Sequence, residues 1–99
     1  MSKRNQGGEE EEVPVPVVLY TRAGCHLCEE MQAELARARP QVPYELTLVD
    51  VDSDPELARL HGLSIPVLEI AGRPAFKGRL TAADFAAKLL RRARERRAT

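Results

Sequence analysis

The sequence predicts an α/β protein, a three-layer sandwich in which a mixed four-stranded sheet has helices on both faces. The chain has 99 residues, which suits a single domain. Hydrophobic residues make up 43% of it, with two Tyr, two Phe and no Trp, so it can bury a modest and mostly aliphatic core. Its apolar segments follow strand and helix patterns in the order β-α-β-α-β-β-α, which is typical of this architecture.

The first half of the chain contains two predicted strands and the helix between them. Prolines precede the apolar run 17–21, a pattern that indicates a buried strand. From Leu27 to Ala38 apolar residues recur at helical spacing with charged residues between them. Pro40 ends this helix, because the residue before a proline avoids the α region. The segment 44–51 is rich in aliphatic and β-branched residues and predicts the second strand.

A short second helix is predicted directly after that strand. Asp54 is a favourable N-cap residue, and Pro55 fits the first helical position. Gly62 is expected to end the helix. We expect Leu57 and Leu60 to face the core, since they are the apolar residues at helical spacing.

Two strands and a last helix complete the pattern. A strand is expected over 66–70, with proline at its first residue, where a missing N–H is tolerated. A turn at 71–74 leads to a short strand at 75–77. Thr81 resembles the first residue of a capping box, and the apolar residues that follow it form a helical stripe over 85–93.

The two ends of the chain differ from this core in composition. Residues 1–12 are rich in Gly, Glu and basic residues and show no periodicity, which is typical of a disordered tail. Residues 94–99 are interpreted as a basic C-terminal tail. The predicted domain therefore spans residues 13–93.

Charge and hydropathy argue against several classes of protein. The 15 basic and 15 acidic residues balance, so the overall charge gives no reason to expect a nucleic acid or an anionic membrane as a partner. No apolar run approaches the roughly 18 residues of a membrane span. The first residues also lack the apolar segment of a secretory signal. We therefore expect a cytoplasmic protein that acts as a monomer.

Two cysteines, Cys25 and Cys28, are spaced C-x-x-C at the junction of the first strand and the first helix. Cys25 falls at the N-cap, where its sulfur can face amide groups that have no partner within the helix. These amides and the helix macrodipole favour the thiolate, and they should lower the pKa of Cys25 below that of a free cysteine. Cys28 is one turn further along, where it can attack a mixed disulfide on Cys25. The spacing predicts thiol–disulfide exchange with Cys25 as nucleophile and Cys28 as resolving residue.

Other interpretations of these residues stay open. A structural zinc site needs four ligands, and the candidates are the two cysteines with His26 and His61. The cysteines can instead be inert buried thiols. His26 either titrates near neutral pH and tunes Cys25 or is an exposed residue of the first helical turn. His61 precedes the end of its helix, which favours a helix-dipole role over a ligand role. We expect no metal site.

Three segments of the chain resemble glutaredoxins. They are the active-site entry at 20–28 (YTRAGCHLC), an acidic strand-to-helix turn at 49–57 (VDVDSDPEL) and a cis-proline loop at 64–68 (SIPVL). They occur in the family order, and the resemblance covers about residues 15–92.

The resemblance implies a thioredoxin-like fold of the glutaredoxin type. It also implies that the Ile65-Pro66 bond is cis and lies beside the cysteines, the alternative being an ordinary trans proline that opens a strand. In such proteins the backbone of the residue before this proline pairs with the substrate, a role that falls to Ile65. The residues expected to complete the substrate site are Arg22, His26, Leu27 and Pro66.

The chain departs from the family pattern before the last helix. Glutaredoxins carry Gly-Gly followed by acidic residues there, whereas residues 77–81 read KGRLT. Half of the usual glutathione site is therefore missing, although Arg22 and Ile65 can still receive glutathione. Lys77 and Arg79 either bind an anionic partner or are solvated turn charges. Between the cysteines the family has Pro-Tyr or Pro-Phe, and this chain has His-Leu.

These observations favour a thiol–disulfide oxidoreductase that reduces protein disulfides or glutathione mixed disulfides. Its partner would be a disulfide-containing protein or glutathione, with glutathione as the candidate co-substrate and no tightly bound cofactor. One alternative is a binding module in which Cys25 and Cys28 hold a metal or an iron–sulfur cluster. The other is a non-catalytic adaptor with the same fold.

Overall fold

The computed structural model of the protein describes residues 13–98, so the tail predicted at 1–12 lies outside the described residues. The strands are β1 (Val15–Thr21), β2 (Tyr44–Asp50), β3 (Val67–Ile70) and β4 (Arg73–Lys77). The helices are α1 (His26–Arg37), the 3₁₀ turn η1 (Val51–Ser53), α2 (Pro55–His61) and α3 (Ala82–Ala98). Apart from η1, this is the predicted order of strands and helices.

The four strands form one mixed sheet in the order β2-β1-β3-β4. β1 is parallel to β2 and antiparallel to β3, and β3 is antiparallel to β4. The parallel pair places Thr21 opposite Asp50, and the antiparallel pair places Tyr20 opposite Val67. The segments that follow β1 and β2 and the segment that precedes β3 therefore lie at the same end of the sheet.

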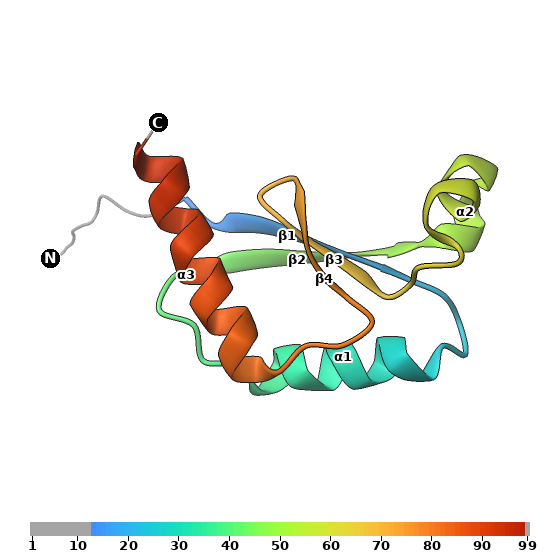
Figure 1. Ribbon diagram of the computed structural model, residues 1–99, viewed down its shortest axis with the longest axis horizontal. Coiled ribbons are helices and arrows are strands. Elements are labelled where there is room, and N and C mark those ends of the chain that lie inside the picture. The colour runs from blue at the N-terminus through green and yellow to red at the C-terminus, as the bar shows by residue number, and fades with distance from the viewer. Residues whose placement is uncertain (1–12, 99) are drawn as a thin grey trace, which may run out of the picture.

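The hydrophobic core lies between one face of the sheet and the helices α1 and α3, which contact each other (Figure 1). Side chains alternate between the faces of a strand, and the inward residues of β1 and β3 are fully buried. The buried residues at the centre of this core are Val17, Leu19, Leu68 and Ile70 from the sheet, Met31 and Leu35 from α1, and Phe85 and Leu89 from α3.

α2 packs on the opposite face of the sheet, near the carboxyl end of β1, and completes the third layer (Figure 1). Its contact there is His61, whose ring stacks on Tyr20 with centroids 4.2 Å apart. Leu57 is half-buried, but Leu60 is 55% exposed, so the prediction that both face the core is wrong for Leu60. Adjacent residues of a helix point about 100° apart. Because His61 faces the sheet, the neighbouring side chain of Leu60 is turned toward solvent.

The largest differences from the predicted boundaries concern β1, β4 and α3; β4 begins at Arg73, inside the turn predicted at 71–74. β1 begins at Val15 and includes Pro16, whose carbonyl oxygen accepts a hydrogen bond from the Ala71 N–H at 2.9 Å. The nitrogen of Pro16 faces the same side, where pairing with β3 starts only at Val17, so its missing N–H leaves no gap in the ladder. α3 continues to Ala98, so residues 94–98 of the predicted tail are helical.

The amino end of α3 is held by side chains from two segments. Thr81 Oγ1 accepts a hydrogen bond from the Asp84 N–H at 3.1 Å, which confirms the predicted cap. Glu34 of α1 accepts a further bond from the Ala82 N–H through Oε1 at 2.8 Å. α1, which begins at the cysteine pair, is thereby tied to α3.

Candidate active site

The cysteine pair lies at the amino end of α1, directly after β1. The connecting turn is closed by a hydrogen bond from the Cys25 N–H to the Arg22 carbonyl oxygen at 3.2 Å. Gly24 within it has a φ of +78°, in the left-handed region that favours glycine. Cys25 is the N-cap of α1, as predicted, and its Sγ accepts a hydrogen bond from the Cys28 N–H at 3.1 Å.

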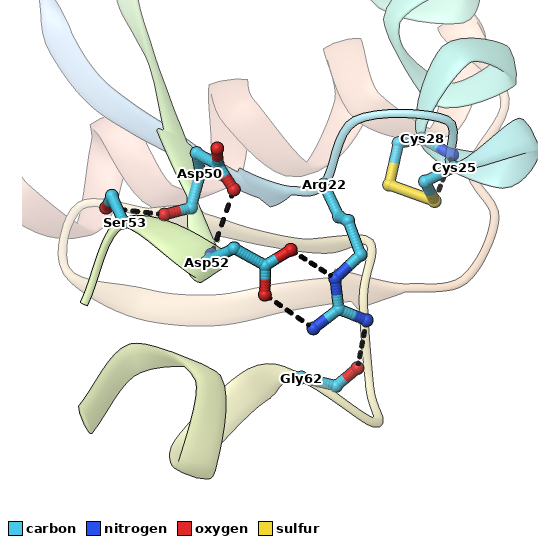
Figure 2. A network of polar contacts seen from close by, with 7 residues as sticks. All are labelled: Arg22, Cys25, Cys28, Asp50, Asp52, Ser53 and Gly62. Atoms are coloured by element: carbon cyan, nitrogen blue, oxygen red, sulfur yellow. Dashed lines mark hydrogen bonds and ion pairs between the residues drawn. A yellow bond between two sulfur atoms is a disulfide. The ribbon is translucent and has the colours of Figure 1, made fainter. Parts of the chain in front are cut away.

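Cys25 and Cys28 form a disulfide, with their Cα atoms 5.2 Å apart (Figure 2). Cys28 is 1% exposed, whereas Cys25 is half-buried. An incoming sulfur therefore has better access to Cys25, while Cys28 sits inside the first turn of the helix. This is the order of exposure that a two-step exchange requires.

A cavity of about 270 Å³ lies beside the disulfide. It is lined by residues of the loop after β1, of α1 and of the end of β2: Thr21, Arg22, Ala23, Gly24, Cys25, Cys28, Glu29, Gln32 and Asp50. A larger hollow of about 630 Å³ lies among α1, β4 and the amino end of α3, but neither cysteine lines it. The smaller cavity is therefore the one that concerns the sulfur chemistry.

Arg22 is held in a network of polar contacts beside the disulfide (Figure 2). Its Nε and Nη2 atoms donate to the two carboxylate oxygens of Asp52 at 2.8 and 3.0 Å, and Nη1 donates to the Gly62 carbonyl oxygen at 3.3 Å. Asp50 Oδ1 in turn accepts a hydrogen bond from the Asp52 N–H at 2.9 Å. The guanidinium predicted to receive a substrate is thus engaged within the protein.

Gly62 ends α2, as predicted, but in the right-handed helical conformation rather than the left-handed one that is common at helix ends. Its carbonyl oxygen is the one that Arg22 contacts. Arg22 therefore links the loop before the cysteines to the segment that leads into the proline loop.

The ion pair shifts the pKa values of both partners. The hydrogen bond from Arg22 lowers the pKa of Asp52, and the same bond raises the pKa of Arg22. Both side chains are partly exposed, 37% for Arg22 and 51% for Asp52. Salt should therefore weaken their attraction.

We expect Asp52 to stabilise the fold at neutral pH and to lose this effect on acidification. Its pKa is lower in the folded protein than in the unfolded chain, where it is about 3.9. The contribution is therefore fully present above the unfolded value and is lost as pH falls through the folded pKa. Urea midpoints of the wild type and Asp52→Asn should differ at neutral pH and converge in acid.

The matched control for this measurement is Glu45→Gln, which removes one exposed carboxylate from β2. No salt bridge involves Glu45 within residues 13–98. A gap between wild type and Asp52→Asn that stays constant from neutral to acid pH would contradict the linkage.

The Ile65-Pro66 peptide bond is cis, as the resemblance implied. Pro66 is buried and Ile65 is half-buried. The loop precedes β3 and so lies at the sheet end that carries the cysteines. The Pro66 carbonyl oxygen accepts a hydrogen bond from the Gly78 N–H at 2.8 Å, which fixes the segment after β4 beside the loop.

The two residues between the cysteines occupy the first turn of α1. His26 is exposed and Leu27 is half-buried. The His26 side chain forms no hydrogen bond or ion pair with the rest of residues 13–98. It faces solvent next to Cys25, and a role for either residue in binding substrate stays a prediction.

The structure does not assemble the four ligands of the zinc alternative. Within residues 13–98, no three His, Cys, Asp or Glu side chains are grouped as a metal site. His61 stacks on Tyr20 at the surface of α2.

Lys77 and Arg79, the two basic residues before the last helix, do not line the cavity beside the disulfide. Lys77 is exposed, and Arg79 forms an exposed ion pair with Glu30 at 3.2 Å.

Three residues of the site are not predicted from the sequence: Asp52 as the partner of Arg22, and Asp50 and Gln32 as cavity residues. The order of strands and helices contains a signal for Asp50 and Asp52. β1 and β2 are connected by a helix and pair in parallel, with Thr21 opposite Asp50. Arg22 must then emerge beside the residues that follow Asp50. No comparable signal marks Gln32, because its place depends on how α1 lies against the sheet.

The fold and the site together define a class of protein. A thioredoxin-like sheet, a C-x-x-C disulfide at the amino end of α1 and a cis-proline loop at the same end of the sheet characterise a thioredoxin-fold protein with a redox-type cysteine pair. A family model agrees: the Glutaredoxin-like domain (DUF836) matches residues 16–90, and the chain belongs to this family. Membership and the disulfide support a thiol redox function.

Two solved bacterial structures are similar to this chain. An X-ray structure of a structural genomics target protein from X. campestris is 33% identical with a TM-score of 0.64, covering 76% of this chain and 96% of that one. A solution NMR structure of a protein from Nitrosomonas europaea is 29% identical with a TM-score of 0.60, covering 87% and 99%. None of the curated proteins matches the chain. In the described part of the chain, no helix is both long and apolar enough to cross a membrane.

Proposed function

We propose that the protein is a thiol–disulfide oxidoreductase that reduces protein disulfides or glutathione mixed disulfides. The observation that carries this proposal is the position of Cys25. Its sulfur caps α1 and accepts a hydrogen bond from the Cys28 N–H at 3.1 Å. The same amide and the helix dipole stabilise a negative charge on that sulfur once the pair is reduced.

The reaction has two exchange steps. The Cys25 thiolate attacks one sulfur of the substrate disulfide, forms a mixed disulfide and releases the other substrate sulfur as a thiolate. The Cys28 thiol loses its proton and attacks the Cys25 sulfur, which releases the second substrate thiolate. The two substrate thiolates take up protons, so one disulfide has become two thiols. The protein is left with the Cys25–Cys28 disulfide seen in the structure.

A thiol reductant must then return the protein disulfide to two thiols before the next cycle. Glutathione is one candidate, and a protein dithiol is another. The exchange needs only the two cysteines, so the proposal includes a monomer without a tightly bound cofactor. The compartment we propose is the cytoplasm, where thiols are kept reduced.

The proposal is tested by disulfide reduction with dithiothreitol as electron source. The substrates are insulin, a glutathionylated peptide and the neutral disulfide bis(2-hydroxyethyl) disulfide. We expect the protein to accelerate at least one of these reductions over dithiothreitol alone. Failure with all three, together with Cys25 alkylation no faster than that of free cysteine, would instead support an adaptor.

A further inference from the structure

The cavity beside the disulfide has an uneven distribution of charge. Three of its lining residues are charged, namely Arg22, Glu29 and Asp50. The charge of Arg22 is matched by Asp52, which binds it through both carboxylate oxygens. Counting Arg22 as +1 and the three carboxylates as −1 each gives a net charge of −2 next to the disulfide.

Glu29 and Asp50 are the carboxylates left over by this pairing. They come from different elements, the first turn of α1 and the last residue of β2, and both are exposed. Neither forms a salt bridge with another residue between 13 and 98. The Asp50 carboxylate is held in place by the Asp52 N–H at 2.9 Å. Its charge is thus fixed at the cavity wall and open to solvent.

Arg22 does not cancel the net negative charge of the cavity. Its guanidinium donates to Asp52 and Gly62 through all three nitrogens. An anionic substrate would have to share this guanidinium with Asp52 and would also approach the carboxylates of Glu29 and Asp50. A cationic substrate would approach the same two carboxylates favourably.

We propose that this site selects disulfides that carry positive charge close to the sulfur atoms and disfavours anionic ones, with Glu29 and Asp50 as specificity-determining residues. The inference rests on the proposed oxidoreductase function and narrows its substrate class. Fixed charges on a cavity wall raise the local concentration of an oppositely charged substrate and repel a substrate of like charge. A natural substrate would be a disulfide flanked by Lys or Arg.

Three small disulfides of similar size test the proposal. Cystamine is a dication, bis(2-hydroxyethyl) disulfide is neutral and 3,3′-dithiodipropionate is a dianion at neutral pH. Each is reduced to two thiols while Cys25 and Cys28 become a disulfide, and dithiothreitol restores the pair and becomes a cyclic disulfide. The values of kcat/KM for the charged substrates are divided by that for the neutral one.

The informative quantity is the ratio of kcat/KM for the dication to that for the dianion. In the double variant Glu29→Gln, Asp50→Asn this ratio should fall about fivefold relative to the wild type at low salt. Intrinsic differences in reactivity between the disulfides cancel in this comparison. Glu45→Gln, which removes a carboxylate of β2 that does not line the cavity, should leave the ratio unchanged. Added salt should reduce the wild-type ratio.

The possible failures are distinguishable. If the neutral disulfide is reduced but the charge ratio is the same in the wild type and the double variant, charge selection is wrong and the oxidoreductase stands. If none of the three is reduced, charge selection among small disulfides is wrong, and the oxidoreductase is then judged separately by the reduction of insulin and of the glutathionylated peptide and by the rate of Cys25 alkylation. Asn at position 50 keeps an oxygen for the Asp52 N–H, and Glu29→Gln alone gives a smaller decrease in the same ratio should the double variant fold poorly.

Discussion

Cys25→Ser is expected to abolish disulfide reduction, lowering the rate to that of dithiothreitol alone. We expect a loss of at least about a hundredfold, because a serine hydroxyl neither ionises at neutral pH nor forms a mixed disulfide. Cys25 is the half-buried N-cap of α1, so serine, itself a favourable N-cap residue, should preserve the helix. Reduction of bis(2-hydroxyethyl) disulfide measures the effect, and circular dichroism confirms the fold.

Cys28→Ser is the matched control, because it removes the buried sulfur and keeps the accessible one. This variant should still attack a disulfide through Cys25 but should not resolve the product. A mixed disulfide should therefore accumulate, seen as an increase in intact mass equal to one substrate thiol less two hydrogens. If the mixed disulfide instead accumulates on Cys28 in Cys25→Ser, the assigned roles are reversed.

Much of the fold follows from local rules. The N-cap at Cys25 follows from an apolar strand, a turn containing Gly24 and a helical pattern that begins at the cysteines. Thr81 likewise caps α3 through its hydroxyl, as its position three residues before Asp84 in the sequence predicts. Such contacts join residues three or four apart, so their geometry is fixed once the helix forms.

The structure differs from the sequence-based prediction where segments that are far apart in the sequence come into contact. The sequence predicts a substrate-binding role for Arg22, whereas its contact with Asp52, 30 residues away, depends on how β1 and β2 pair. α3 continues past the predicted boundary because its last turns are rich in good helix formers and Glu95 pairs with Arg73 of β4 at 2.8 Å. Hydropathy alone predicts an end at Ala93, since the apolar stripe stops there.

The contacts of Arg92 are also beyond local rules, because its partners lie 18 to 22 residues away in the sequence. Arg92 is only 9% exposed. Its Nη1 donates to the carbonyl oxygens of Ile70 and Arg73 at 3.0 and 2.9 Å, and Nη2 donates to that of Pro74 at 2.9 Å. Burial lowers the pKa of this guanidinium. Arg92 thus fixes α3 to the turn between β3 and β4.

Arg92→Met is expected to reduce the free energy of unfolding by about 2 to 4 kcal/mol. Methionine fills much of the volume but removes three hydrogen bonds to backbone carbonyl oxygens, one of them at the end of the buried strand β3. Hydrogen bonds that involve a charged group contribute about 1.5 to 3 kcal/mol each, although the effects are not additive. Urea unfolding followed by circular dichroism measures the change.

Arg91→Met provides the comparison, because Arg91 is the exposed neighbour on the same helix and loses the same charge. Its unfolding free energy should stay within about 0.5 kcal/mol of the wild type. If the two variants are equally stable, Arg92 contributes only charge and its three hydrogen bonds add nothing. A large difference would mean that the short β3–β4 hairpin, whose first strand follows the cis-proline loop, depends on α3 for its anchorage.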